Sequence, residues 1–372
     1  MIKSYAKAAL RPVWRRLRSR IEVIADERIA VHSVPEPEPE PEPVEEEPPF
    51  ALREACEAEF QALRGRVLGL EQTMHSVYTV LNEQVNNAAQ MRRSVFAPDP
   101  ALTPSLEGAP FMAASNCQAS DFYHPRYLQL CKLMALRPQF HRKQWEWVYI
   151  LHQLVEAGML RPGARGLGFG VGTEPLPAVF ASMGVEVMAT DAPVDLDRAD
   201  AWHATNQHSD DVAQLLRPEI APDDLVRAKV SHRPCDMNHI DPELTGYDFN
   251  WSSCCFEHLG SIDKGLEFVV NAVEKTLKMG GLAVHTTEYN ASSNDATVTE
   301  GDTVIFRLQD MQRLVERLTE RGHEVQPFII GPTAHALDFH VDVPPYAHDI
   351  HLKLLLAGYV TTSAGIVVRR GK

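Results

Sequence analysis

The stretch GARGLGFGVGTEPLPAVFASMGVEVMATDAP, residues 163–193, indicates the fold of this chain. It predicts a short strand at 164–167 that runs into a glycine-rich turn. A helix at 176–183 and a second strand at 186–190 follow, and that strand ends at Asp191. Alternate glycines let the backbone turn tightly and approach a ligand closely, and an acid about 20 residues further on suits a ribose diol. The predicted ligand contacts are Gly168, Gly170, Gly172 and Asp191.

The glycines are spaced as GxGxG, and Thr173 stands where a third dinucleotide glycine would be. This spacing favours adenosylmethionine over NAD, because a pyrophosphate needs the glycine nearest the helix. Glu174, at the start of the predicted helix, would also repel a pyrophosphate, whereas it could face a methionyl ammonium. The sequence therefore predicts that Glu174 is a further contact of the cofactor.

From about residue 126 to the end, apolar β-branched runs alternate with helical patterns, which is typical of an α/β sheet. With these features the chain resembles the class I, Rossmann-like methyltransferases that use S-adenosylmethionine. In that family the glycine turn holds the methionyl part of the cofactor, and the acid after the second strand holds the ribose. The matching positions are Gly168, Gly170, Gly172 and Asp191. Gly166 replaces an acid that the family usually has before the first glycine, and Glu174 is a candidate for its role.

The resemblance continues through four further segments. VSHRPCDMNHI (230–240) resembles the third strand, after which the family holds adenine with an acid and the next backbone amide, here Asp236 and Met237. GYDFNWSSCCFEHLG (246–260) resembles the fourth strand, and LKMGGLAVHTTEYN (277–290) resembles a turn and the fifth strand. The final SAGIVVRR would be an antiparallel last strand. The resemblance implies a seven-stranded, mostly parallel sheet with helices on both faces, and S-adenosylmethionine as cofactor.

The fuller pattern is similar to bacterial methyltransferases found beside polysaccharide and glycoconjugate genes. The shared elements include Trp202, Gln207, His208, Trp251 to Gly260, His285 to Asn290 and Val341 to Tyr346. This resemblance implies methylation of an oxygen, rather than a nitrogen, on a sugar or glycoconjugate-linked acceptor.

Candidate catalytic residues follow the predicted strands. Methyl transfer to a hydroxyl needs an aligned acceptor and a base, and the carboxyl ends of strands form the usual crevice of an open α/β sheet. His258 and Glu288 lie there and are candidate bases, with a structural hydrogen bond as the alternative for each. Asp338, His340 and Asp342 alternate, so they would share one face of a strand. That face could bind the acceptor, hold Mg²⁺ or form a polar edge; His340 is the next candidate base, and we assign no metal ligand.

Three further segments precede the predicted catalytic domain at 126–372. Residues 1–30 predict a basic amphipathic helix, which either contacts a membrane surface or a partner, or is simply solvated. Residues 31–50, with their alternating Pro and Glu, predict an extended linker, because proline blocks backbone hydrogen bonds and the glutamates repel each other. Residues 93–125 are rich in Pro, Ala and Ser and predict a second linker.

The strongest helical pattern covers residues 51–92. Its apolar positions advance in alternating steps of four and three, which is the a/d seam of a coiled coil. The seam consists of Cys56, Phe60, Leu63, Val67, Leu70, Met74, Val77, Leu81, Gln84 and Ala88. A homo-oligomer formed through residues 52–92 would cover this stripe, and a helix packed on its own catalytic domain is the alternative.

Composition narrows the functional classes. The chain has 372 residues, 44% of them apolar, and a net charge of −14. It therefore lacks the broad positive field that attracts nucleic acid, and a small-molecule or glycan acceptor is expected. The six cysteines form no CxxC pair, and no apolar run is long enough for a bilayer, so we expect a cytoplasmic protein that is at most peripheral at the inner membrane.

Two other functions fit parts of the sequence. An NAD-dependent sugar oxidoreductase would need GxGxxG and a Tyr-x-x-x-Lys pair after the fourth strand, and neither is present. A non-catalytic coiled-coil assembly protein with a vestigial cofactor fold would not need to keep Asp191 and Asp236. A methyltransferase is therefore the prediction.

Overall fold

The structure, a computed structural model, describes residues 50–95, 110–193 and 209–371. The basic helix predicted at 1–30 lies outside the described residues, as does the linker that follows it. The same holds for Trp202, Gln207 and His208.

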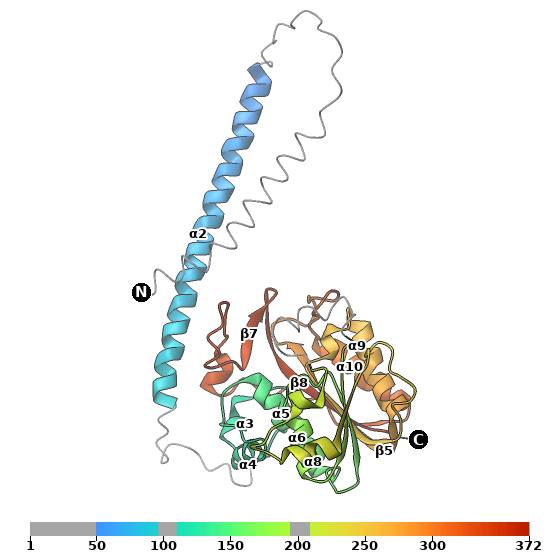
Figure 1. Cartoon of the computed structure of the whole chain (residues 1–372). Coiled ribbons are helices and arrows are strands. Elements are labelled where there is room, and N and C mark those ends of the chain that lie inside the picture. Colours follow the sequence, from blue (N-terminus) through green and yellow to red (C-terminus); the bar gives the residue numbers. More distant parts are fainter. Residues whose placement is uncertain (1–49, 96–109, 194–208, 372) are drawn as a thin grey trace, which may run out of the picture. The chain divides into compact units, whose positions relative to one another are not determined.

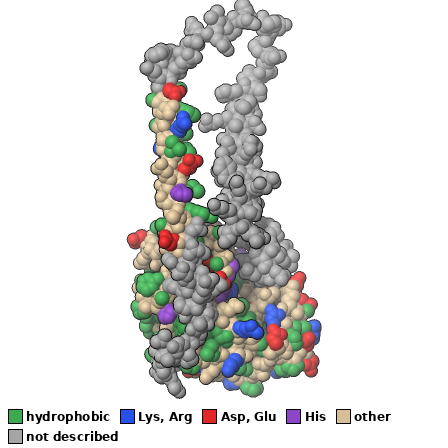
Figure 2. Space-filling view, turned by 90° about the vertical axis from the view of Figure 1, so that its left-hand side faces the viewer, with side chains coloured by type: hydrophobic (Ala, Val, Ile, Leu, Met, Phe, Trp, Pro, Cys, Tyr) green, Lys and Arg blue, Asp and Glu red, His purple; other side chains and the backbone are tan. Residues whose placement is uncertain are grey.

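Helix α2 (Phe50–Val95) runs without a break over 46 residues, which confirms the helix predicted at 51–92. It crosses the boundary between two compact units, residues 1–73 and 74–372. The seam side chains with 50–71% of their surface exposed are Phe60, Leu63, Val67, Leu70, Met74 and Val77. Figure 2 shows hydrophobic side chains among charged ones along this helix. Of the helices that the structure describes, none has the length and apolar character to cross a membrane.

The described residues of the second unit form one eight-stranded sheet (Figure 1). The strands are β1 (Arg165–Phe169), β2 (Glu186–Asp191), β3 (Val230–Pro234), β4 (Tyr247–Ser253), β5 (Leu277–Asn290), β6 (Glu324–Val325), β7 (Lys353–Leu356) and β8 (Tyr359–Arg369). Their order is β3-β2-β1-β4-β5-β8-β6, and β7 pairs with β8. The first five strands in this order are parallel, whereas β8 is antiparallel to β5, β6 and β7. The mostly parallel α/β sheet and the antiparallel last strand are therefore confirmed.

The predicted number of strands, seven, is wrong by one, because β7 and β8 form a hairpin. Ala357 and Gly358 join them with φ values of +49° and +85°. Two successive positive φ values match the right-handed twist of paired strands. An Ala-Gly turn is a weaker hairpin signal than Asn-Gly, which is why sequence alone does not reveal it.

Helices cover both faces of the sheet, as predicted (Figure 1). They are α3 (Ala119–Tyr123), α4 (Pro125–Leu133), α5 (Arg142–Glu156), α6 (Leu176–Ser182), α8 (Asp223–Lys229), α9 (Ile262–Asn271) and α10 (Leu308–Glu320), with the short turns η1 (Val212–Leu215), η2 (Phe256–His258), η3 (Ala272–Thr276) and η4 (Ala336–Phe339). One hydrophobic cluster includes Trp145 of α5 and Phe180 of α6. A second includes Phe268 of α9 and Leu314 of α10. The sheet thus lies between two cores, and its strand ends remain available for a site.

Strand β1 carries glycines because strand β4 places aromatic rings against it. A Cβ on Gly166 would lie 2.5 Å from the Phe249 ring, and one on Gly168 would lie 2.5 Å from the Trp251 ring. The Phe249 ring therefore fills the space in which the family's acid would stand. Gly168, predicted as a ligand contact, is a packing glycine within the strand, and the turn itself begins at Gly170.

Residues 110–125, predicted as linker, belong to the folded domain instead. The Ser115 amide donates to the Ile329 carbonyl at 2.6 Å, and the Cys117 amide donates to the Ser363 carbonyl at 2.9 Å. Cys117 is buried. The segment owes its order to backbone pairing with distant strands, and a composition rich in Pro, Ala and Ser does not reveal such pairing.

The alternating face predicted for Asp338, His340 and Asp342 is wrong. Residues 336–339 form the turn η4, in which Asp338 accepts hydrogen bonds from the amides of Ala119 and His335 at 2.8 and 3.0 Å. Asp338 thus caps a turn and is tied to the distant Ala119 amide, so residues 336–339 do not form the predicted strand. Asp338 and His340 therefore leave the predicted site.

Candidate functional site

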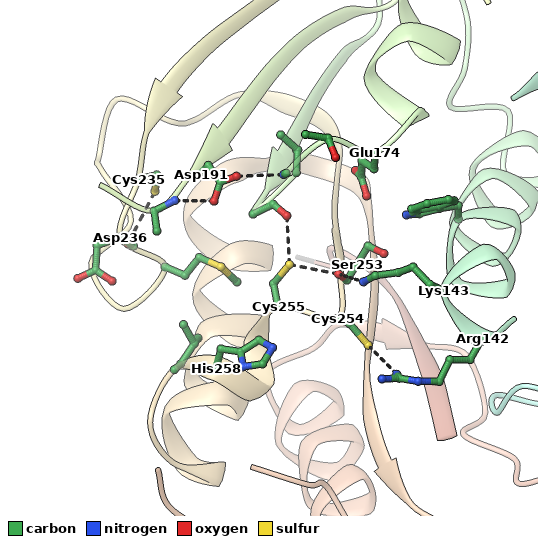
Figure 3. A pocket seen from close by; sticks show the side chains of 18 of the residues that line it. Arg142, Lys143, Glu174, Asp191, Cys235, Asp236, Ser253, Cys254, Cys255 and His258 are labelled. Carbon is green, nitrogen blue, oxygen red and sulfur yellow. Dashed lines mark hydrogen bonds between the residues drawn. The ribbon is translucent and has the colours of Figure 1, made fainter. Parts of the chain in front are cut away.

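A cavity of about 490 Å³ opens at the carboxyl ends of β1 to β4, within the roughly 300–1,000 Å³ usual for small-molecule sites (Figure 3). Its glycine-loop side, as we call it, consists of Gly170, Val171, Gly172, Thr173, Glu174, Asp191, Asp236 and Met237. Its histidine side consists of His141, Arg142, Lys143, His348 and His351. Between them lie Ser253, Cys254, Cys255, His258 and Leu259.

The turn after β1 owes its shape to two glycines in the left-handed region of the backbone. Gly170 and Gly172 have φ values of +59° and +50°, which L side chains rarely adopt. A Cβ on Gly170 would lie 2.7 Å from the Cys255 sulfur, whose thiol donates to the Gly170 carbonyl at 3.2 Å. Both predicted glycines therefore line the cavity, and the loop passes close to the end of β4.

Asp191 ends β2 and ties the surrounding loops together. Its Oδ2 accepts from the amides of Gly172 and Ser209 at 3.0 and 3.1 Å, and its Oδ1 accepts from the Ala192 amide at 2.8 Å. A carboxylate offers about four acceptor positions, so three are occupied by the protein. Among the residues that the structure describes, these three amides leave about one acceptor position of the carboxylate for a ribose hydroxyl.

Glu174 lines the cavity but is also a partner of the core. The Trp251 indole Nε1 donates to its carboxyl group at 2.6 Å. Burial raises the pKa of Glu174 to about 8. At neutral pH the carboxyl is therefore mostly protonated, and it becomes anionic where a positive group approaches it.

Asp236 and Met237 follow β3 on the same side of the cavity. The Asp236 carboxylate accepts from the Asn238 amide at 2.9 Å and pairs with His239 Nδ1 at 2.7 Å. In Figure 3 this carboxylate points away from the other labelled side chains. Both residues line the cavity, as the predicted adenine contacts should.

Arg142 and Lys143, at the first turn of α5, bring charge to the histidine side. Arg142 Nη2 lies 2.8 Å from Glu288, and Lys143 Nζ lies 3.0 Å from Glu146 and 2.9 Å from the Ser253 carbonyl. Glu146 is fully buried. Our sequence reasoning missed both cations. Their position could have revealed them, because cations at a helix N-terminus are unfavourable next to the helix dipole. Such cations indicate that acidic partners elsewhere in the fold hold them.

The structure separates the three candidate bases. His258 lines the cavity; its Nδ1 donates to the Asp302 carbonyl at 2.8 Å, and its Nε2 lies 4.0 Å from Oε1 of Glu257. Glu288 is buried behind the cavity and pairs with Arg142, so it positions that guanidinium. Burial is the main cause that raises the pKa of Glu288, and Arg142 opposes it. Among the residues that the structure describes, His340 does not line the cavity.

Two of the three histidines on the histidine side, His141 and His351, are poorly solvated bases. Burial and the neighbouring His351 together lower the pKa of His141 to about 4. Burial also lowers the pKa of His351, against the effect of its hydrogen bond to Asp342. Both imidazoles are therefore neutral at pH 7.

No family model and no curated protein matches the chain. The similar solved structures include a TehB-like SAM-dependent methyltransferase from Corynebacterium glutamicum, at 15% identity over 59% of this chain and 86% of that one, with a TM-score of 0.31. They also include phosphoethanolamine N-methyltransferase 2 of Haemonchus contortus in complex with S-adenosyl-L-methionine, at 14% identity over 68% and 58%, with a TM-score of 0.37.

A third similar structure is magnesium protoporphyrin IX methyltransferase of Synechocystis PCC 6803 with bound SAH, at 11% identity over 68% of this chain and 97% of that one, with a TM-score of 0.36. Identities and TM-scores this low establish no shared activity. These three solved structures are methyltransferases, and the cofactor predicted from the sequence of this chain, or SAH, is bound in two of them.

Proposed function

We propose that this chain is an S-adenosylmethionine-dependent methyltransferase whose acceptor is an oxygen of a sugar or of a glycoconjugate. The observation that carries the proposal is Asp191. Its carboxylate accepts from the Gly172 amide of the glycine turn, and it lines the cavity, where the described residues leave about one of its acceptor positions for a ligand. An acid in that place suits a ribose hydroxyl of S-adenosylmethionine. The glycine turn beside it leaves room for the methionyl part.

The other residues of the glycine-loop side suit the remaining parts of the cofactor. Asp236 and Met237 would hold the adenine, and Glu174 would meet the methionyl ammonium, whose charge favours the ionised carboxylate. When bound, S-adenosylmethionine supplies an electrophilic methyl group. His258 takes the acceptor's hydroxyl proton at Nε2, and its Nδ1–H bond to the Asp302 carbonyl keeps it in the required tautomer.

Calorimetry with S-adenosylmethionine, S-adenosylhomocysteine and NAD tests the proposal on the full-length protein. A methyltransferase binds the first two and not NAD. NAD binding alone would favour the sugar oxidoreductase. If none of the three binds to the folded protein, the proposal fails, and the non-catalytic assembly protein is the remaining function.

The acceptor class needs its own experiment. Transfer of a labelled methyl group is measured to a panel of free sugars, nucleotide sugars and amines, and the product's methylated atom is identified by mass spectrometry. We expect methyl ethers of sugars. Methylated amines, with sugars inert, would contradict the sugar proposal and leave the methyltransferase proposal intact.

We also propose that residues 52–92 join copies of the chain. The exposed seam of α2 includes Leu63, Val67 and Leu70, and burying each such side chain stabilises by roughly 1.5–3 kcal/mol. Light scattering coupled to size exclusion should show a dimer or trimer that Leu70→Glu disrupts. The matched variant Arg64→Glu, off the seam, should leave it intact. A monomeric wild-type protein would contradict the coiled coil.

For residues 1–30, outside the described residues, we propose contact with an anionic membrane surface from the cytoplasmic side. Seven of their side chains are cationic among Ala, Leu and Trp14 in residues 1–20. Sedimentation with phosphatidylglycerol vesicles should pull the protein down, and neutral phosphatidylcholine vesicles should not. Equal binding to both vesicles, or to neither, would contradict the proposal.

A further inference from the structure

Three imidazoles meet at the mouth of the cavity although their segments are far apart in the chain. His141 precedes α5, and His348 and His351 lie in the segment before β7. One ring nitrogen from each lies within 4.8 Å of the other two. The ring centroids of His351 are 4.7 Å from those of both His141 and His348. All three residues line the cavity.

Backbone pairing holds the two segments together. The Arg142 amide donates to the His351 carbonyl at 2.9 Å, and the His351 amide donates to the Phe140 carbonyl at 2.7 Å. His141 and His351 form a parallel bridge through these bonds. The convergence of the rings therefore rests on main-chain hydrogen bonds and does not depend on side-chain rotamers alone.

Asp342 organises the loop that carries the other two histidines. Its Oδ1 accepts from the Ala347 amide at 3.1 Å, and its Oδ2 accepts from the His348 amide at 3.1 Å. His351 Nδ1 lies 2.6 Å from the same Oδ2. Because a carboxylate only accepts, Nδ1 carries the proton, and the lone pair of His351 is on Nε2. A carboxylate behind an imidazole in this way is the usual second partner of a metal-ligating histidine.

We propose that His141, His348 and His351 bind a divalent first-row transition-metal ion, of which Zn²⁺ is the first choice. Imidazole nitrogens suit zinc, and three histidines with one open position form a known type of zinc site. Zn–N bonds of about 2.0–2.1 Å need the three nitrogens to move closer together than they are here. The exposed His348 can move on its surface loop, and the stacked rings of His141 and His351 must turn so that their nitrogens face one ion.

Two neighbouring features bear on this site. His141 Nδ1 accepts from the Lys143 amide at 3.1 Å, so ligation through Nε2 shifts the ring proton to Nδ1 and breaks this helix cap. One cap is a small loss beside three metal–nitrogen bonds. The cations Arg142 and Lys143 lie close by, but Glu288 and Glu146 pair with them and reduce their repulsion of an ion.

Because all three histidines line the cavity, the fourth position of such an ion would be open to the cavity, across from the glycine-loop side. It would therefore take an oxygen of the acceptor, such as a hydroxyl, a diol or a carboxylate, and select acceptors that offer one. This consequence for the acceptor rests on the proposed function, whereas the binding of the ion does not.

The test uses full-length protein that has been freed of metal with a chelator. Zn²⁺ is titrated by calorimetry, and Co²⁺ is titrated by visible absorption, whose intensity reports tetrahedral coordination. We expect one ion per chain. His348→Ala and His351→Asn should each weaken Zn²⁺ binding by at least 100-fold, and Asp342→Asn should weaken it by about 10–100-fold. His340→Ala, in the same segment but outside the cluster, should bind as the wild type does.

Circular dichroism establishes that each variant is folded, and His348→Ala, at an exposed position, should fold even if His351→Asn does not. Absence of Zn²⁺ and Co²⁺ binding to the wild type would overturn the site. So would binding that His348→Ala leaves unchanged, since the ion would then sit elsewhere, for example at Cys254, Glu257 and Glu288. S-adenosylmethionine affinity of the metal-free protein is measured in parallel, so failure of the proposed function is seen separately.

Discussion

The two sides of the cavity are built in different ways. The glycine-loop side comes from consecutive strand–helix units, and its key acid, Asp191, is held by backbone amides. The histidine side joins residues 141–143 to residues 348–351, and ion pairs to the buried carboxylates of Glu288 and Glu146 hold its cations. The geometry of the glycine-loop side depends mainly on backbone conformation and backbone hydrogen bonds, which the nearby sequence sets. A side held by charge pairs depends on each partner in turn, because removing one leaves the other buried and unpaired.

This difference predicts where substitutions act. On the glycine-loop side, a change at Asp191 should alter binding of the cofactor more than stability, whereas a change at Glu174, which is buried against Trp251, should alter how stability varies with pH. On the histidine side, a changed partner of a cation should alter stability first. The four predictions below test this contrast, and they run from the largest expected effect to the smallest.

The largest effect is expected at His258, which lies between the two sides. His258→Ala should lower turnover by about 10²–10⁴-fold, because it removes the proposed base, and should leave S-adenosylmethionine affinity near normal. Turnover is measured by labelled methyl transfer and affinity by calorimetry. Normal turnover in the folded variant would show that the base lies elsewhere or that the acceptor needs none.

The next effect concerns Glu174 and pH. The folded carboxyl, with a pKa of about 8 against an ordinary 4.5, keeps its proton where the unfolded chain has lost it. The folded state then binds more protons between these values, so the stability contributed by this group falls as pH rises from about 4.5 to 8. Glu174→Gln still accepts from Trp251 but does not ionise. Its stability relative to wild type should therefore rise by up to about 4 kcal/mol from pH 5 to pH 8.

Urea denaturation at several pH values measures this difference. The histidines with lowered pKa values titrate in both proteins, so their contribution cancels. Parallel pH profiles for the two proteins would show that Glu174 keeps an ordinary pKa. Backbone hydrogen bonds alone would then hold the glycine-loop side.

On the histidine side, Glu288→Gln removes the charge that faces Arg142 Nη2 at 2.8 Å. We expect a loss of about 3 kcal/mol, near the low end for a buried pair because Glu146 lies 3.6 Å from Arg142 Nη1. The matched control is Asp263→Asn. Its partner Arg313 lies at a similar 2.9 Å, but both side chains are at least half exposed, so the loss should be below about 1 kcal/mol. Equal losses in denaturation would refute the contrast.

The smallest effect is expected at Asp191. With one acceptor position open to a ribose, Asp191→Ala should weaken S-adenosylmethionine binding by about tenfold, the low end for a hydrogen bond to a charged group. Asp211→Ala, at an exposed helix cap nearby, should bind normally. Calorimetry at one salt concentration compares the two. An affinity unchanged by Asp191→Ala would remove the ribose assignment.

Much of the fold could be predicted from sequence because it follows local periodicity. The strand at 186–190 and the helix at 176–183 were predicted within a few residues of their observed bounds, and the segment 230–240, which resembled a third strand, contains β3. Gly168, a predicted ligand contact, lies within β1 against the Trp251 ring, and sequence alone does not reveal this packing because Trp251 comes from another strand. Residues 110–125 were misassigned as a linker, because their order comes from distant backbone partners.

The sequence by itself determined the α/β class, the long helix α2 and the positions of Gly170, Gly172, Asp191, Asp236 and Met237 along one edge of the sheet. The class, the helix, the glycines and Asp191 follow from hydrophobic period and turn chemistry, which act over a few residues. Asp236 and Met237 were predicted from the resemblance to the methyltransferases. Only the tertiary structure decided that Glu288 stands behind Arg142, that His340 leaves the site, and that His141 meets His351. Such contacts depend on which distant segments pair through their backbones or through buried charges. The local pattern of the sequence does not show these long-range contacts.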